Sequence, residues 1–100
     1  MTKQTTLTIQ ENRGAARLWI QGSILTDNGW TKGKQWVMTA KDGVVTLKAA
    51  KGDEPKLRKV AGNEKRPVID TKDPRIGEAF PVGTRVVVDV TKNAITIREE

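Results

Sequence analysis

The sequence contains no cysteine and no histidine. A disulfide framework, a thiol nucleophile, a cysteine- or histidine-based zinc site and acid–base catalysis by imidazole are therefore excluded. No apolar run approaches the roughly 20 residues of a transmembrane helix, and residues 1–6 lack the features of a signal peptide. We expect a cytoplasmic protein without a membrane partner. Because no catalytic motif is present, we also predict no enzyme activity, no cofactor and no metal.

Apolar residues make up 36% of the 100 residues, which is enough for one modest hydrophobic core. We therefore predict a single domain over residues 1–100. The chain has 18 lysines and arginines against 12 aspartates and glutamates, so its formal net charge is +6. A basic balance favours a polyanionic partner, because counterions released from a phosphate backbone contribute affinity that does not depend on sequence.

Two stretches of the chain, 33–48 and 83–98, share one pattern. Each begins with a glycine and contains two runs of alternating apolar and polar residues, as in a β-hairpin. Asp42-Gly43 is a favoured pair for a tight two-residue turn, because both positions tolerate positive φ. Asn93 stands in the place of Gly43, and asparagine also tolerates the left-handed conformation. The residues predicted to face the core are Trp36, Met38, Ala40, Val45 and Leu47 in the first hairpin and Val86, Val88, Val90, Ile95 and Ile97 in the second.

The similarity continues upstream of both hairpins. A predicted strand at 17–20 corresponds to one at 67–69 if one residue of slack is allowed. Trp30 corresponds to Phe80, each three residues before its glycine. Repeated units of this size seldom bury their apolar faces alone, so we expect each copy to complete the core of the other. The two copies of this strand–short helix–hairpin unit span about 17–48 and 66–98.

A short helix is predicted between the strand and the hairpin of each copy. Ser23 is expected to cap the first helix, and Asn28-Gly29 to end it in the left-handed conformation. Asp73 is expected to cap the second helix, with Pro74 as its first helical residue.

Two further segments lie outside the copies. An additional N-terminal strand is predicted at about 5–10, where Leu7 and Ile9 alternate with polar residues. Residues 49–65 are rich in lysine, glycine and acidic residues and have almost no large apolar side chain. Such a composition is typical of a solvated, mobile linker, and we predict a basic linker there.

A series of residues carries a resemblance to a known family. In the first copy it comprises 17–25, 28–33 and the hairpin to Leu47, and in the second 68–70, Ile76, 78–84 and 95–97, together about two thirds of the chain. Their order resembles that of the AbrB/MazE superfamily, and within it of SymE-like proteins. The resemblance implies a mostly β fold in which two tandem copies form a small swapped-hairpin barrel, a pseudo-dimer in one chain. It also implies DNA binding through basic residues on one face. Because members of the superfamily are usually homodimers, a second copy of this chain stays an alternative partner.

We predict that nucleic acid binds through two sets of basic residues. Lysines in the linker would contact phosphates as point charges without reading bases. This first set comprises Lys56, Arg58, Lys59 and Lys65. A second set would form a symmetric surface suited to a roughly symmetric duplex. It comprises Arg17, Lys32, Lys34, Arg66, Arg75 and Arg85. The alternative for both sets is ordinary surface charge that keeps the protein soluble.

The three tryptophans could instead stack on bases, as aromatic residues do in single-strand binders. The alternation places Trp36 on the inner face, and Trp30 shares its position with a phenylalanine. We therefore predict that both lie in the core, and that Trp19 is the one with a chance of exposure.

These features favour a non-enzymatic DNA-binding protein, for example a regulator from a phage or mobile element, with DNA favoured over RNA. One alternative is an RNA-directed toxin, because SymE-like proteins are regarded as such. A second alternative is a protein-binding inhibitor of a host nuclease or defence complex.

Overall fold

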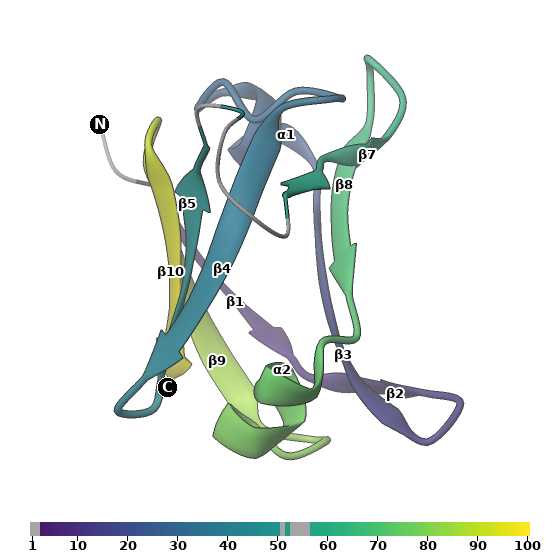
Figure 1. The fold of residues 1–100 in the computed structure, drawn as a ribbon, viewed down its shortest axis with the longest axis vertical. Helices are drawn as coiled ribbons and strands as arrows, with labels where there is room; N and C mark the ends of the chain where they lie inside the picture. Colours follow the sequence, from purple (N-terminus) through teal and green to yellow (C-terminus); the bar gives the residue numbers. More distant parts are fainter. Residues whose placement is uncertain (1–2, 51, 53–56) are drawn as a thin grey trace.

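A computed structural model describes residues 3–50, 52 and 57–100 (Figure 1). The fold is mostly β, as the sequence predicts, with two short helices, α1 (Ser23–Thr26) and α2 (Pro74–Ala79). The strands are β1 (Lys3–Thr8), β2 (Gln10–Asn12), β3 (Ala15–Gln21), β4 (Gln35–Lys41), β5 (Val44–Ala49), β6 (Arg58–Lys59), β7 (Ala61–Gly62), β8 (Pro67–Thr71), β9 (Arg85–Val90) and β10 (Ala94–Glu99). Neither helix of the described segments is long and apolar enough to cross a membrane.

The strands form two antiparallel sheets, which face each other in Figure 1. One sheet has the order β1-β9-β10-β5-β4-β6, and the other the order β2-β3-β8-β7. The chain passes from one sheet to the other at Ile9, between β1 and β2, and at Val60, between β6 and β7. A closed barrel requires each strand to pair with the next around the whole circumference. Among the described strands the ladders end at these two corners, so the prediction of a closed barrel is wrong.

Strands from the two halves of the chain pair with each other in both sheets. In the smaller sheet β3 pairs with β8, with Ile20 opposite Ile69. In the larger sheet β5 pairs with β10, with Thr46 opposite Thr96, while β1 pairs with β9 and β6 with β4. As a result, one hydrophobic cluster contains side chains from both halves.

The predicted inward faces of the two hairpins are confirmed with one exception. The buried residues are Trp36, Met38, Val45, Leu47, Val86, Val88, Val90, Ile95 and Ile97. The exception is Ala40, which is exposed because it lies at the end of β4, beside the hairpin turn. Trp30 is also fully buried, as predicted.

The first hairpin has the predicted turn, and the second does not. Asp42 and Gly43 have φ angles of 53° and 77°, as a tight two-residue turn requires. Asn93 does not adopt a positive φ. The loop between β9 and β10 has three residues, and Thr91 closes it instead, through bonds of its backbone N–H and its hydroxyl to the Ala94 carbonyl. The prediction for Asn93 is therefore wrong.

Of the two predicted helix caps, one is confirmed and the other is wrong. Asp73 caps α2 as predicted, because its carboxylate accepts a 2.9 Å bond from the Arg75 backbone N–H, and Pro74 is the first helical residue. Ser23 does not cap α1: the capping position belongs to Gly22, without a side-chain bond. Gly29 ends this turn with a φ of 81°, as predicted.

The predicted linker is partly a component of the sheets. Residues 58–62 form β6 and β7, and Val60 between them is buried. The prediction of a linker is wrong for these residues, because the backbone of Val60 bonds to the turn before β4 and its side chain enters the core.

Candidate nucleic-acid interface

The turn at residues 31–34 places Lys32 at one end of the molecule. Gly33 has a φ of 89°, and a 3.0 Å backbone bond closes the turn. Two bonds attach it to Val60: Gly33 N–H donates to the Val60 carbonyl at 2.9 Å, and Val60 N–H donates to the Lys34 carbonyl at 3.0 Å. The exposed side chain of Lys32 makes no hydrogen bond or ion pair with any other described residue.

The turn at residues 63–66, between β7 and β8, presents two further cations. Asn63 and Arg66 exchange two backbone bonds of 3.2 Å. The Asn63 Oδ1 also accepts bonds from the backbone N–H groups of Lys65 and Arg66, at 2.9 and 2.8 Å. Asparagine at the first position of a turn favours this arrangement. The side chains of Lys65 and Arg66 are exposed and have no hydrogen-bond or ion-pair partner among the described residues.

These two turns border a shallow depression of about 550 Å³. Its lining residues are Lys32, Asn63, Glu64, Lys65 and Arg66. Glu64 is the one carboxylate of this lining against three cations, so the surface has a net positive charge. Arg66 also lines an adjoining depression of about 280 Å³, with Gln21 and Gly22.

The loop between β9 and β10 is attached to the same surface. The indole N–H of Trp30 donates to the Thr91 carbonyl at 2.7 Å, and the Lys34 ammonium donates to the Lys92 carbonyl at 2.8 Å. The ammonium of Lys34 also lies 4.6 Å from the centroid of the Trp30 ring. Partial burial and the nearby charge of Lys92 lower the pKa of Lys34.

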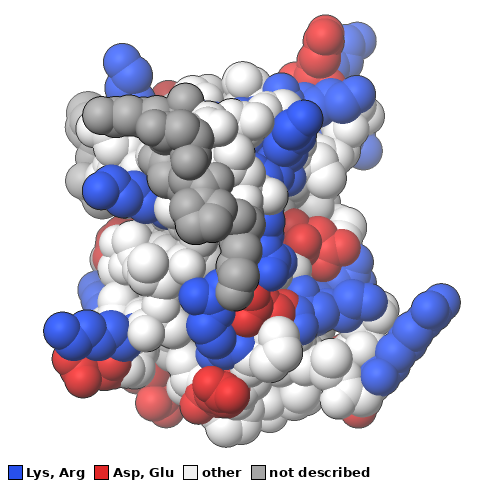
Figure 2. All heavy atoms as spheres, viewed as in Figure 1, with Lys and Arg blue, Asp and Glu red and all other residues white. Residues whose placement is uncertain are grey.

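We call this surface the basic end, and it is formed by Lys32, Lys34, Lys65, Arg66 and Lys92. Figure 2 shows lysine and arginine side chains at the top of the view, where α1 and the β7–β8 turn lie in Figure 1. Two carboxylates, Asp27 and Glu64, lie in the loops that border it.

A turn of the same geometry, at residues 81–84, follows α2 at the opposite end of the molecule (Figure 1). Gly83 has a φ of 93°, and a 3.0 Å backbone bond closes this turn as well. Gly83 N–H donates to the Ile9 carbonyl at 2.8 Å, and Ile9 N–H donates to the Thr84 carbonyl at 2.9 Å. Ile9 thus makes the two bonds here that Val60 makes at the first turn.

The two turns differ in the side chains that they present. Lys32 and Lys34 of the first turn correspond to Val82 and Thr84 of the second. The side chain of Val82 is 52% exposed and is not part of the buried core. Since the same backbone forms without lysine, the turn geometry does not require a cation at either position, although Lys34 also bonds to the β9–β10 loop.

Arg17, predicted to bind nucleic acid, is paired within the smaller sheet. Its guanidinium forms two hydrogen bonds with the Asp70 carboxylate, at 2.8 and 2.9 Å. These bonds lower the pKa of Asp70, with a smaller contribution from the charge of Lys72. The guanidinium also lies 4.3 Å from the centroid of the Trp19 ring, so this half-buried tryptophan is partly covered. The charge of Arg17 is therefore balanced inside the protein.

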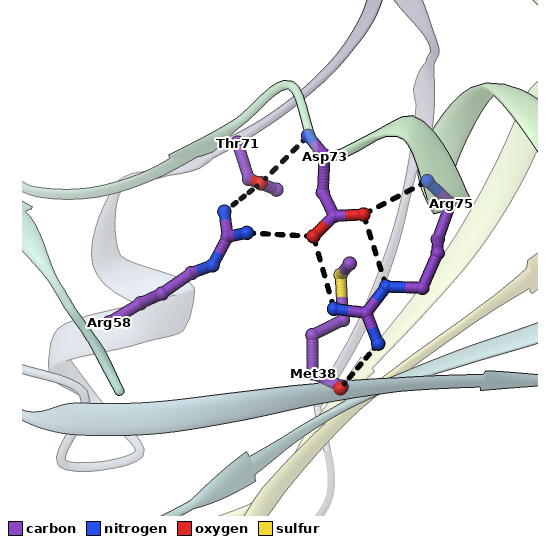
Figure 3. Close-up of polar contacts among 5 residues, drawn as sticks. All are labelled: Met38, Arg58, Thr71, Asp73 and Arg75. Carbon is purple, nitrogen blue, oxygen red and sulfur yellow. Dashed lines mark hydrogen bonds and ion pairs between the residues drawn. The ribbon is translucent and has the colours of Figure 1, made fainter. Parts of the chain in front are cut away.

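Arg58 and Arg75 converge on one carboxylate (Figure 3). Arg58 donates to the Asp73 carboxylate at 2.7 Å and to the Thr71 hydroxyl at 2.8 Å. Arg75 forms two bonds of 3.0 Å to the same carboxylate and a third of 3.0 Å to the Met38 carbonyl. This cluster connects β6, β8 and α2 to β4.

The arginines depress the pKa of Asp73 to about 2. The side-chain bonds from Arg75 contribute most, burial partly opposes them, and the backbone N–H and charge of Arg75 and the charge of Arg58 add to the shift. Although the side chains of Arg58 and Arg75 are 38% and 39% exposed, their guanidinium donors are used for this contact. The cluster therefore mainly joins elements of the fold. Its two guanidiniums share one carboxylate, that of Asp73.

The remaining predicted residues are dispersed. Arg85 lies in β9, bonded to the Thr6 hydroxyl at 3.2 Å and 3.8 Å from a carboxylate oxygen of Glu100. Lys59 is exposed in β6, opposite Gln35 of β4. Lys56 lies outside the described residues.

The structure thus brings together four of the predicted residues, Lys32, Lys34, Lys65 and Arg66. It separates Arg17 from Arg66, which the sequence pairs as counterparts. Each lies three residues before the central pair Ile20–Ile69 of two antiparallel strands, so the two Cα atoms are about 20 Å apart at roughly 3.3 Å per residue. Arg17 and Arg66 therefore do not lie in one cluster of cations.

A comparison of the chain with protein-family models, with curated proteins and with solved structures gives no match. The residues of the basic end therefore carry the functional argument without support from a relative.

Two residues of this surface were not predicted. Lys92 corresponds to Asp42 in the other hairpin, and this reversal of charge is visible in the aligned halves. Gly62-Asn63 begins a short polar stretch that ends at Pro67, which is an ordinary turn signal. Both signals were present in the sequence, but only the folded chain places Asn63 beside Lys32 and Lys92 beside Lys34.

Proposed function

We propose that this chain is a non-enzymatic DNA-binding protein that uses its basic end to contact the phosphate backbone. The observation that carries the proposal is the difference between the two matching turns. Their backbones are alike, yet lysines occupy the turn that lies near Lys65 and Arg66, and valine and threonine occupy the other turn. Cations that the fold does not require, gathered around a concave surface, suit a polyanion.

We further propose that the two halves are tandem copies of one unit, arranged as a pseudo-dimer as in the AbrB/MazE superfamily. β1 of the first half pairs with β9 of the second, and β6 of the second pairs with β4 of the first. Ile9 and Val60 make corresponding bonds to corresponding turns. This exchange of strands between halves supports the likeness, which in that superfamily accompanies DNA binding.

The mechanism is electrostatic docking of one end. Lysines and arginines release counterions from the phosphates, and the logarithm of the binding constant falls with the logarithm of salt by about 0.9 for each contact. If all five cations make contact, the slope is no steeper than about −4.5. Because these five cations lie at one end, one protein molecule engages the duplex without requiring a symmetric sequence.

The test is a fluorescence-anisotropy titration of a labelled 20-base-pair duplex at several salt concentrations. The variant Lys32→Gln/Lys65→Gln/Arg66→Gln removes three unpaired cations from the basic end, so we expect weaker binding and a salt slope shallower by about 2.7. The control Arg13→Gln/Lys41→Gln/Lys72→Gln removes the same charge from exposed sites away from that end, and we expect it to keep most of the slope.

Equal losses in the two variants would mean that net charge alone drives binding and would refute the proposal. Degradation of RNA by the purified protein would instead support the toxin hypothesis. A tight stoichiometric complex with a protein, without affinity for DNA, would support the inhibitor hypothesis.

A further inference from the structure

The aromatic side chains of this protein lie in the core or are covered by another side chain. The sequence has three tryptophans, one phenylalanine and no tyrosine. Trp30, Trp36 and Phe80 are at most 1% exposed. Trp19 lies in β3 under the guanidinium of Arg17. No aromatic ring is therefore exposed at the basic end.

This arrangement discriminates between forms of nucleic acid. Proteins that hold single strands combine a basic groove with exposed aromatic rings, and each stacked base contributes roughly 1–3 kcal/mol. A duplex keeps its bases stacked inside and presents phosphates outside, so cations on a shaped surface suffice to bind it. The basic end has cations and no ring on which an unpaired base can stack.

The turn at residues 63–66 is also held in one conformation. Gly62, before it, has a φ of 85°, and a Cβ at this position would lie 2.2 Å from the Arg66 carbonyl oxygen. The Asn63 side chain accepts hydrogen bonds from the backbone N–H groups of Lys65 and Arg66. The turn with Lys32 is bonded to Val60, only three residues before Asn63, so the two turns are anchored at neighbouring positions of one segment.

We propose that the basic end binds the sugar–phosphate backbone of duplex DNA in preference to a single strand, and that Asn63 is the positioning residue that aims Lys65 and Arg66 at the phosphates. The proposal rests on the proposed function and adds the form of the partner and the residue that orients the contact. Arg66 lines both adjoining depressions. If each depression holds one phosphate of a strand, the Arg66 side chain can contact two successive phosphates. Asn63 itself need not touch DNA.

The experiment compares a labelled 20-base-pair duplex with one of its own strands, chosen to lack self-complementarity, at 50 mM and 150 mM salt. We expect the wild type to bind the duplex at least several-fold more tightly than the strand. Asn63→Ala changes no charge but removes two hydrogen bonds, so we expect roughly threefold to tenfold weaker duplex binding. Asn63→Ser restores an acceptor oxygen and should recover most of the affinity. Thermal melting of each variant checks that the fold persists, which is expected because Asn63 is exposed.

The outcomes separate this inference from the proposed function. Single-strand binding as tight as duplex binding, still lost in the Lys32/Lys65/Arg66 variant, would overturn the preference for duplex and leave the basic end as the DNA site. Unchanged duplex binding by a folded Asn63→Ala protein would overturn the positioning role. Failure of both nucleic acids to bind at 50 mM salt would refute the proposed function itself.

Discussion

Replacement of Asp73 by asparagine tests the cluster that connects α2 to β4. Asparagine is nearly isosteric and retains an oxygen that can accept the capping bond from the Arg75 backbone. The substitution therefore removes mainly the charge that Arg58 and Arg75 share. We expect it to lower the free energy of unfolding at neutral pH.

The magnitude follows from the pKa of Asp73, which falls from an ordinary 3.8 to about 2 in the folded protein. A shift of this size corresponds to roughly 2 kcal/mol, at about 1.4 kcal/mol for each pH unit. The Asp73 side chain is only 9% exposed, but both arginine side chains are more than one-third exposed, so water screens part of the attraction. We therefore expect a loss of about 1–2 kcal/mol.

The sign of the pH dependence is fixed by the direction of the shift. Because the folded pKa is depressed, the stabilisation is complete above about pH 4, and it is lost as the pH falls toward 2. Urea unfolding, followed by tryptophan fluorescence at pH 6, 4, 3 and 2, should show the wild type approaching Asp73→Asn as the pH falls. The difference between the two proteins isolates this group from the other carboxylates.

Asp73→Ala is the matched control, because it also removes the cap. It should remain less stable than the wild type at pH 2, by about 1 kcal/mol. A difference between wild type and Asp73→Asn that stays constant from pH 6 to pH 2 would refute the charge argument, as would a difference below about 0.3 kcal/mol at pH 6.

Three further predictions concern the turns. Trp30→Phe should lower the unfolding free energy by about 1–3 kcal/mol, because the carbonyl that accepts the indole bond loses its buried partner; urea unfolding measures this loss. Gly33→Ala and Gly83→Ala should each lower the free energy of unfolding by about 1–2 kcal/mol, because both glycines have positive φ and neither has an atom near the added Cβ. The two losses should be similar, and clearly different melting midpoints would contradict the likeness of the turns. Val82→Lys/Thr84→Lys places lysines at the corresponding positions of the opposite turn, in addition to those of the basic end. It should raise duplex affinity and steepen the salt slope by up to about 1.8. An unchanged slope would show that lysine at this turn geometry does not contact phosphate.

Gly77→Ala serves as the control for the glycine substitutions. Gly77 lies in α2 without a positive φ, and an added Cβ would make an ordinary contact of 3.4 Å with Ala16. Alanine is favoured over glycine in a helix by up to about 1 kcal/mol, so this variant should be as stable as the wild type or more stable.

Local features of the fold could be predicted from the sequence because neighbouring residues determine them. Alternation of apolar residues identified both hairpins and their buried faces. Asp42-Gly43 specified its turn, and Asp73-Pro74 specified the start of α2, because φ preferences and capping bonds act within a few residues. The prediction of a positive φ at Asn93 was wrong because this loop has one more residue than the first turn and is closed by Thr91.

The clustering of charge required the tertiary structure. Arg17 and Asp70 are 53 positions apart, and Arg58 and Asp73 are 15 apart, so no residue next to either arginine in the sequence indicates its partner. Lys32, Lys65 and Arg66 have no such partner among the described residues, and they line one depression because Val60, three residues before Asn63, bonds to the turn that carries Lys32. The sequence by itself determined how many cations the chain carries and which strands form. Antiparallel pairing of the two halves decided which cations meet at one end, because it sends corresponding residues to opposite ends of the molecule.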